Sequence, residues 1–336
     1  MRGVARGILE TVGDTPLVEL ARLMPDFPGR IYAKLERANP GGSIKDRAAL
    51  TILRDGLRSG AVVAGRTTVV ESSSGNLAIG LAQACRCLGL DLVCVVDRKT
   101  TDQNIRMLRA LGARVEVVRT PDPESGEYLP ARLARVREIV AANPDAFWPN
   151  QYANPLNPIA QRQTMHEIAQ GLGGRVDYLF AATSTCGTLL GCMDYIREQG
   201  MGTRTVAVDA VGSVLFGHAP RPRLLPGHGA SVRTPLSERA RPDLVAHVTD
   251  LDCVLACRRL ARREGFLAGG SSGATIAALR QLAGAIEPGA VCVLIFPDGG
   301  DRYLDTIYSD EWVRGHFGEI PDPDDAPLLV LEGTPC

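Results

Sequence analysis

Short runs of β-branched and apolar residues alternate along this chain with segments whose apolar residues recur at helical spacing. In the first half this predicts strands at 67–71, 91–97 and 114–118 and helices at 76–89, 101–113 and 129–144. In the second half it predicts strands at 176–183, 203–211 and 290–296 and helices at 186–200, 251–265 and 274–284. Continuous apolar strands alternating with helices are typical of α/β proteins whose parallel sheets are covered on both faces. Such sheets bind ligands at the carboxyl ends of their strands.

The length and charge of the chain exclude several classes of protein. Its 336 residues predict two domains, with a boundary near 145–150. A net charge of -1 gives no basic surface for nucleic acid. No apolar run is long enough to cross a bilayer, and the amino terminus lacks the apolar core of a secretion signal. We therefore expect a cytoplasmic protein with neither a nucleic-acid nor a membrane partner.

The nine cysteines predict packed, reduced thiols. Their number is odd, and several lie in apolar runs such as "LVCVV" and "AVCVLIF". The pairs Cys85/Cys87 and Cys253/Cys257 could suggest a metal site. However, no second pair has zinc-finger spacing, and the five histidines are scattered. We expect no metal.

Three strand-to-helix turns are unusually rich in small polar residues: "ESSSGN" (71–76), "TSTCGT" (183–188) and "GGSSGA" (269–274). Backbone N–H groups at the start of a helix bind carboxylates or phosphates, so the first turn indicates an anion site. Its simpler interpretation is a helix N-cap, for which one residue would suffice. The second turn lacks both the Walker and the dinucleotide pattern. The third, taken alone, favours a connection with a capping serine.

Lysine is rare in this chain, and one lysine lies in the glycine-rich stretch "NPGGSIKDRA" (39–48), where a helix is expected to begin. The three lysines are Lys34, Lys45 and Lys99, which leaves 37 − 3 = 34 arginines. Arginine supplies a surface charge as well as lysine does, but only lysine forms an imine with an aldehyde. An imine-forming Lys45 together with a phosphate-binding turn indicates pyridoxal phosphate.

Seven segments together resemble the cysteine synthase and cystathionine β-synthase family, the fold-type II pyridoxal phosphate enzymes. They are "VGDTPLVEL", "AKLERANPGGSIKDRAA", "ESSSGNLAIGLA", "NQYANPLNP", "ATSTCGTLLG", "EGFLAGGSSGAT" and "FPDGGDRYLDTIYSD". They occur in the family's order from about Val12 to Asp310. The resemblance implies two doubly wound parallel-sheet domains with the cofactor in the cleft between them. It implies a smaller mobile domain over 41–147, a larger cofactor domain over 1–40 plus 148–320, and a homodimer. The acidic, proline-rich composition of the chain's end separately predicts a loose tail over 321–336.

The resemblance also implies roles for individual residues. Lys45 would bind pyridoxal 5'-phosphate covalently and act as the catalytic base, and Asn76 would contact the ring hydroxyl. The phosphate would be bound by Ser184, Thr185, Cys186, Gly187 and Thr188. Ser271 would meet the pyridine nitrogen, and this neutral partner favours β-replacement over transamination. The substrate, including its α-carboxylate, would be bound by Ser73, Ser74, Asn76, Gln151 and Tyr152.

The chain departs from the usual cysteine synthase pattern at several positions. Leu77 and Tyr152 replace the usual threonine and phenylalanine, Ser184 and Cys186 replace glycines, and "FPDGGDRY" replaces "LPSSGERY". These features are more similar to one branch, the N-(2-amino-2-carboxyethyl)-L-glutamate synthases. That branch joins O-phospho-L-serine and L-glutamate, a step toward 2,3-diaminopropionate for siderophores or peptide antibiotics. The similarity of this chain to that branch implies a transferase that forms a carbon–nitrogen bond and releases phosphate.

Several alternatives stay open. One is a cysteine synthase or O-phosphoserine sulfhydrylase that uses sulfide, or a related cystathionine β-synthase-like enzyme. Others are a non-catalytic protein that kept the fold, and a dehydrogenase, which the missing dinucleotide fingerprint disfavours. Tyr152 and Ser184 could contact glutamate, or they could bond the backbone and the phosphate alone. Composition offers Arg221, Arg223, His228 and Arg233 as anion-binding residues, and for each of them an ordinary surface position is the alternative.

Overall fold

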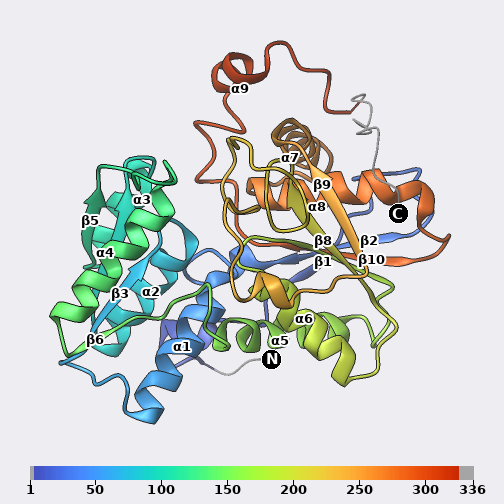
Figure 1. Cartoon of the computed structure of the whole chain (residues 1–336). Helices are drawn as coiled ribbons and strands as arrows, with labels where there is room; N and C mark the ends of the chain where they lie inside the picture. Colours follow the sequence, from blue (N-terminus) through green and yellow to red (C-terminus); the bar gives the residue numbers. More distant parts are fainter. Residues whose placement is uncertain (1–3, 325–336) are drawn as a thin grey trace. The chain divides into compact units, whose positions relative to one another are not determined.

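A computed structural model describes residues 4–324 of the chain, which divide into two compact units (Figure 1). Unit 1 contains the chain up to Asp14 together with Ala38–Ala160. Unit 2 contains Thr15–Arg37 and the chain from Gln161 onward. Short 3-10 helices lie at Ile8–Thr11, Glu36–Ala38, Ser237–Arg239 and Ala283–Ala285.

Unit 1 is built on a four-stranded parallel sheet in the order β5-β4-β3-β6. Its elements are α1 (Lys45–Ser59), β3 (Thr68–Ser72), α2 (Asn76–Leu88), β4 (Asp91–Asp97), α3 (Asp102–Ala110), β5 (Arg114–Val118), α4 (Tyr128–Ala142) and β6 (Ala146–Phe147). Alternate strand residues face opposite layers, as the period of a strand requires. Val69 and Cys94 pack with α2, whereas Val70 and Val93 pack with Val136 of α4.

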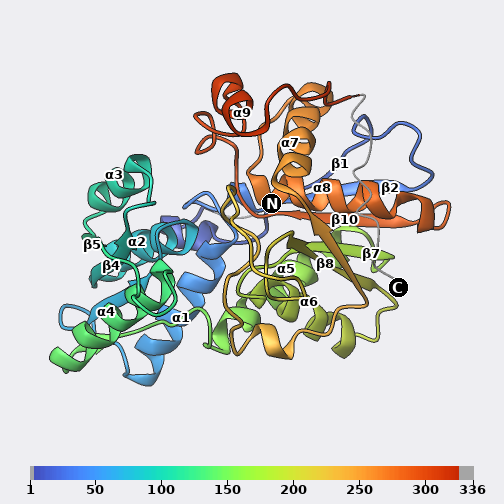
Figure 2. The same ribbon diagram turned by 45° about the horizontal axis from the view of Figure 1, so that its top comes forward.

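Unit 2 is built on a six-stranded sheet in the order β1-β2-β10-β7-β8-β9, in which only β1 is antiparallel to its neighbour. Figures 1 and 2 show α7 and α8 on one side of this sheet and α6 on the other. Its strands are β1 (Leu17–Glu19), β2 (Arg30–Leu35), β7 (Tyr178–Ala182), β8 (Arg204–Ala210), β9 (Leu244–Val248) and β10 (Val291–Phe296). Its helices are α6 (Gly187–Glu198), α7 (Asp250–Glu264), α8 (Gly270–Leu282) and α9 (Asp310–Phe317); α5 (Leu156–Gly171) begins just before the unit boundary.

The predicted alternation of strands and helices is confirmed, with corrections at particular elements. The expected strands at 91–97 and 114–118 coincide with β4 and β5. The helix expected from residue 274 begins at Gly270, so the "GGSSGA" turn forms its first turn and is not a connection. This start is possible because Gly273 lets α8 approach α7: a Cβ there would lie 2.4 Å from the carbonyl oxygen of Cys253. The expected elements do not include β2, α5, β9 or α9.

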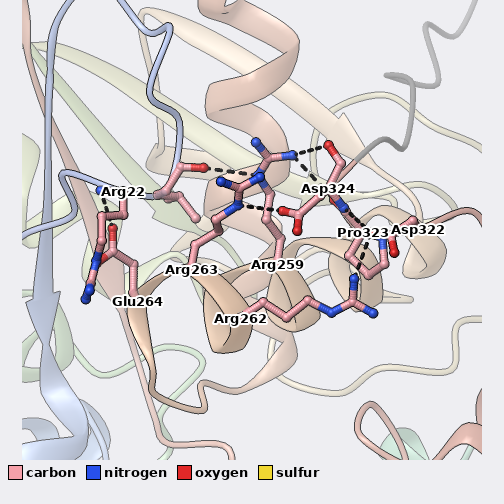
Figure 3. A network of polar contacts seen from close by, with 9 residues as sticks. Arg22, Arg259, Arg262, Arg263, Glu264, Asp322, Pro323 and Asp324 are labelled. Carbon is pink, nitrogen blue, oxygen red and sulfur yellow. Dashed lines mark hydrogen bonds and ion pairs between the residues drawn. The ribbon is translucent and has the colours of Figure 1, made fainter.

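The end of the described chain is attached to α7 (Figure 3). Arg259 donates to the carbonyl oxygen of Asp324 at 2.8 Å, Arg262 pairs with the Asp322 carboxylate at 2.7 Å, and Arg263 pairs with the Asp324 carboxylate at 2.8 Å. These contacts fix 322–324 on the outer surface of the helix. The rest of the predicted tail, 325–336, lies outside the described residues.

Seven of the cysteines within the described part of the chain are buried free thiols, as expected, and Cys87 is exposed. Cys336 lies outside the described residues. Within 4–324, no group of three histidine, cysteine or acidic side chains is arranged to hold a metal ion. In the same range, no helix has the length and hydropathy needed to span a membrane.

Candidate active site

Lys45 is the first residue of α1, as the sequence predicts, and its side chain is partly exposed. Its backbone N–H donates to the Ser43 hydroxyl at 3.2 Å. The next residue, Asp46, is buried, and its carboxylate accepts the backbone N–H of Gly41. A Cβ at Gly41 would lie 2.5 Å from that carboxylate, so the glycine allows the loop to fold back on the helix start. The glycine-rich stretch therefore presents Lys45 at a fixed helix terminus.

The turn between β3 and α2 carries Ser73, Ser74 and Asn76 at the carboxyl end of a parallel strand. The Ser73 hydroxyl accepts the backbone N–H of Ala78 at 3.2 Å, so Ser73 does act as a cap of α2. Ser74 and Asn76 are partly exposed, and the Ser74 carbonyl oxygen accepts from the Asn104 side chain at 3.0 Å. One serine is thus used for capping, and the other polar groups lie at a helix N-terminus, which favours anions.

Gln151 and Tyr152 follow β6 in the same unit. Gln151 is buried; its carbonyl oxygen accepts from the Asn157 side chain at 2.9 Å, and its N–H donates to the Glu71 carboxylate at 3.4 Å. Tyr152 is partly exposed, and within the described chain no hydrogen bond joins its hydroxyl to the backbone. Burial raises the pKa of the Tyr152 phenol, and the nearby Arg132 opposes that rise. The alternative that Tyr152 merely bonds the backbone is therefore not favoured.

Arg132 is a largely buried cation that the sequence analysis does not single out, and its charge acts on the Tyr152 phenol. Arg132 of α4 is paired with Asp97, at the end of β4, with 3.3 Å between Nε and Oδ2. The side chains of Arg132 and Asp97 are only 12% and 9% exposed. Nothing in "LPARLARVREIV" distinguishes Arg132 from its exposed neighbours, because only the packing of α4 on the sheet buries it. Arg132 is therefore a candidate for binding an anionic group.

In unit 2, the turn after β7 carries the five residues expected to bind phosphate. Thr185, Cys186 and Gly187 are buried, whereas Ser184 and Thr188 are partly exposed. The N–H of Gly187 donates to the Thr185 hydroxyl at 3.2 Å. Cys186 has the left-handed conformation, with φ 64, directly before α6 begins. Hydroxyls and N–H groups at the positive end of a 12-residue helix form a suitable anion site.

Ser271 lies in the first turn of α8, also in unit 2, and is 2% exposed. Gly227 has φ +98, and a Cβ there would lie 3.4 Å from the Ser271 hydroxyl oxygen. Gly269, directly before α8, approaches Asp298. The Asp298 carboxylate accepts from the Tyr303 hydroxyl at 2.8 Å. Glycines at 227 and 269 thus keep bulk away from the start of α8.

The four candidate anion-binding residues of the loop over 217–235 differ in their surroundings. Arg221 and Arg233 are exposed, and Arg233 donates to the carbonyl oxygen of Val214 at 3.2 Å. Arg223 donates to the carbonyl oxygen of His228 at 2.9 Å and thereby fixes the loop itself. His228 is 2% exposed, and burial lowers its pKa to about 4, so the imidazole is neutral at pH 7. These contacts indicate structural roles.

The residues of each unit, taken separately, fit pyridoxal 5'-phosphate. In unit 1 a lysine begins a helix, and a polar turn lies at the end of β3. In unit 2 the turn before α6 has the hydroxyls and N–H groups that a phosphate needs, and Ser271 supplies a neutral hydroxyl. No residue of either set carries a charge that would repel a phosphate.

Comparisons with known proteins give consistent results. The profile of the family described as "pyridoxal-phosphate dependent enzyme" matches residues 8–298. The chain is 48% identical over 315 residues to N-(2-amino-2-carboxyethyl)-L-glutamate synthase of Ralstonia nicotianae, covering 92% of this chain and 91% of that protein. It is similar to O-acetylserine dependent cystathionine beta-synthase from Helicobacter pylori (TM-score 0.84, 32% identity, 92% of this chain and 100% of that one). It is also similar to O-acetyl serine sulfhydrylase isoform 3 from Entamoeba histolytica (TM-score 0.84, 30% identity, 91% and 92%).

Proposed function

Because the chain belongs to the pyridoxal-phosphate dependent enzyme family, and its cofactor is pyridoxal 5'-phosphate, we propose that it catalyses one particular β-replacement. The reaction joins O-phospho-L-serine and L-glutamate to give N-[(2S)-2-amino-2-carboxyethyl]-L-glutamate and phosphate. The main support is the 48% identity, over 92% of the chain, to a synthase of that product. A role toward 2,3-diaminopropionate for siderophores or peptide antibiotics and a homodimeric state are parts of the same proposal.

The cofactor, when bound, draws electrons from the α-carbon of an amino acid joined to it. In the proposal, Lys45 and Asn76 of unit 1 contact the cofactor directly. Residues 184–188 bind the phosphate, and Ser271 meets the ring nitrogen. A neutral hydroxyl at the nitrogen, instead of a carboxylate, favours loss of a β-substituent over transamination.

Residues of this chain carry out the proton transfers, and the bonds that form and break belong to the two substrates. The released Lys45 amine takes the proton from the α-carbon of O-phospho-L-serine. The bond between the β-carbon and the phosphate oxygen breaks, and phosphate leaves with the bonding pair. The amine of glutamate then forms the new β-carbon–nitrogen bond and loses a proton, and Lys45 returns a proton to the α-carbon. Ser73, Ser74, Asn76 and Gln151 hold the α-carboxylate throughout.

Arg132 extends this scheme, because both substrates carry an extra anionic group. The Arg132 side chain is only 12% exposed and its charge acts on Tyr152, whose phenol can add a hydrogen bond. Charge-assisted bonds from arginine to phosphate or carboxylate are among the strongest polar contacts in proteins. We therefore place at Arg132 and Tyr152 either the donor phosphate or the side-chain carboxylate of glutamate.

The proposal is tested with the purified holoenzyme and O-phospho-L-serine, offering L-glutamate and sulfide in separate reactions. We expect phosphate release to depend on glutamate, with the carbon–nitrogen product identified by its mass. Cysteine formed with sulfide, and no adduct with glutamate, would instead identify an O-phosphoserine sulfhydrylase. That rival is tested because O-acetylserine-dependent enzymes are among the similar structures.

A further inference from the structure

Glu71 is a fully buried carboxylate at the end of β3, surrounded by N–H donors. One oxygen accepts the backbone N–H of Ser72 at 2.8 Å and the indole N–H of Trp148 at 3.2 Å. The other accepts the backbone N–H of Gln151 at 3.4 Å, and the N–H of Asn150 also bonds the carboxylate. One side chain thus holds the end of β3 and the segment 148–151 together.

The backbone of this segment is shaped to reach the carboxylate. Asn150 has a left-handed conformation, with φ 48, which few residues other than glycine adopt. Successive N–H groups around such a residue converge on one anion. At Asn150 and Gln151 that anion is the protein's own carboxylate. Burying it without these donors would cost several kcal/mol, so the contacts are required for the fold of this region.

The two segments that meet at Glu71 are those expected to bind the substrate's α-carboxylate. Ser73, Ser74 and Asn76 follow Glu71 directly in the chain, and Gln151 is one of its hydrogen-bond partners. A carboxylate bound from both segments requires them at a fixed separation. We propose that Glu71 is a positioning residue, which sets this separation and thereby the affinity for the α-carboxylate of the amino-acid substrate. The inference rests on the proposed function, because it assumes that an amino acid binds there.

An ionised carboxylate satisfies all the donors of this contact. All the groups around Glu71 are donors, so each oxygen must accept. A glutamine would turn its own N–H₂ group toward either the Ser72 and Trp148 donors or the Asn150 and Gln151 donors. An aspartate would keep the charge but is shorter by one methylene. We therefore expect glutamine to separate the segments and aspartate to weaken the contact less.

Few other titratable groups face Glu71. Among the described residues they are the Cys94 thiol of β4 and the Tyr152 phenol, and the charge of Arg132, the partner of Asp97, also acts on Tyr152. Burial raises the pKa of Glu71 to about 7 despite its N–H bonds, while burial keeps the thiol and the phenol neutral there. At pH 8, above this pKa, the carboxyl is mostly ionised, which is the form that accepts all of its N–H donors.

The test compares wild type, Glu71→Gln and Glu71→Asp holoenzymes with L-alanine, which has the α-carboxylate but no β leaving group. Binding is followed by the visible absorbance of the coenzyme, and hydrogen exchange is measured over 148–152 without ligand. At pH 8 we expect Glu71→Gln to raise the Kd of L-alanine by about tenfold or more and to speed exchange in that segment, with Glu71→Asp intermediate. Turnover at saturating substrate should fall much less than the affinity.

Asp243→Asn serves as the control. Asp243 accepts a backbone N–H from Thr205 of β8 at 2.7 Å, as Glu71 does from its partners, but it lies directly before β9 in unit 2. The Asp243→Asn variant should leave the Kd of L-alanine unchanged. Should Glu71→Gln not fold, Trp148→Phe removes one donor and should raise the Kd about two- to fivefold, by the loss of one hydrogen bond. A Kd within twofold of wild type, with unchanged exchange at 148–152, overturns the inference. If wild type binds L-alanine but does not convert O-phospho-L-serine, the proposed function fails while the role of Glu71 is still decided.

Discussion

The Lys34 ammonium lies 2.6 Å from the Glu167 carboxylate, and the two side chains are only 1% and 6% exposed. Lys34 also donates to the carbonyl oxygen of Thr15 at 2.6 Å, within unit 2. This pair explains one of the three lysines without imine chemistry. Lys99 is exposed, with its ammonium 5.7 Å from the centre of the Tyr128 ring. The scarcity of lysine alone therefore does not identify Lys45, and the glycine-rich loop and the resemblance to the family are needed as well.

Replacing Lys34 by methionine should destabilise the protein strongly. The change leaves the Glu167 charge buried without its ion-pair partner, which costs about 3–5 kcal/mol in comparable cases. Urea unfolding at pH 7.5 measures the loss. The double variant Lys34→Met with Glu167→Leu should recover most of it, because neither charge of the pair is then left buried without its partner. A loss below about 1 kcal/mol in the single variant would contradict the buried pair.

Replacing Lys45 by alanine should abolish turnover while the protein stays folded. Loss of the base alone removes a factor of about 10²–10⁴ in rate, and loss of the covalent link adds to it. After borohydride reduction, wild type should gain the mass of the coenzyme at Lys45, and the variant should not. Lys99→Ala is the control and should behave as wild type. A reduced coenzyme retained on the alanine variant would refute the assignment of Lys45.

Replacing Arg132 by methionine should weaken binding of one anionic substrate. The change is made in an Asp97→Asn background, so that no buried carboxylate is left unpaired. Losing a buried charge contact costs about 2–5 kcal/mol, which predicts at least about a 30-fold rise in KM. The KM values of O-phospho-L-serine and L-glutamate, measured separately, show which group Arg132 binds. Equal values in the double variant and in Asp97→Asn alone would exclude Arg132 from the site.

The Cys186→Gly variant should be more stable than the Cys186→Ala variant. This is the reverse of the usual order of alanine and glycine in helices. Cys186 has φ 64, a conformation that costs any residue with a Cβ about 1–2 kcal/mol. Cys186→Gly and Cys186→Ala both remove the thiol, so urea unfolding should differ by about 1 kcal/mol in favour of glycine. Cys192 is buried inside α6, and there the order should reverse by about 1 kcal/mol.

The free energy of unfolding should fall between pH 4.5 and pH 7 through Glu71. Burial raises the pKa of Glu71 from 4.5 to about 7, so the folded protein binds the extra proton in this range. Its stabilising contribution is complete below pH 4.5 and is lost as the pH rises through 7. Glu71→Gln should remove this slope, as urea unfolding across the range would show. Parallel curves for wild type and the variant would mean that the pKa of Glu71 is not raised.

The agreement between sequence and structure is uneven for physical reasons. β4 coincides with its expected range because a strand buried on both faces has an apolar interior. β2 is not predicted, because Arg30 and Lys34 interrupt its apolar run, and only the pairing with Glu167 permits the buried lysine. The start of α8 at Gly270 is not predicted either, because glycine and serine are typical of turns.

The sequence by itself determined the α/β alternation, the three polar turns and the position of Lys45 at the start of a helix. These are local properties, set by apolar periodicity and by glycine and hydroxyl residues next to each other in the chain. Only the tertiary structure decided that Arg132 is largely buried and paired with Asp97, and that Glu71 bonds Gln151 across 80 residues of sequence. Burial and pairing depend on which distant segments pack together. The sequence around Arg132 or Glu71 does not differ from that around other charged residues in a way that would predict this packing.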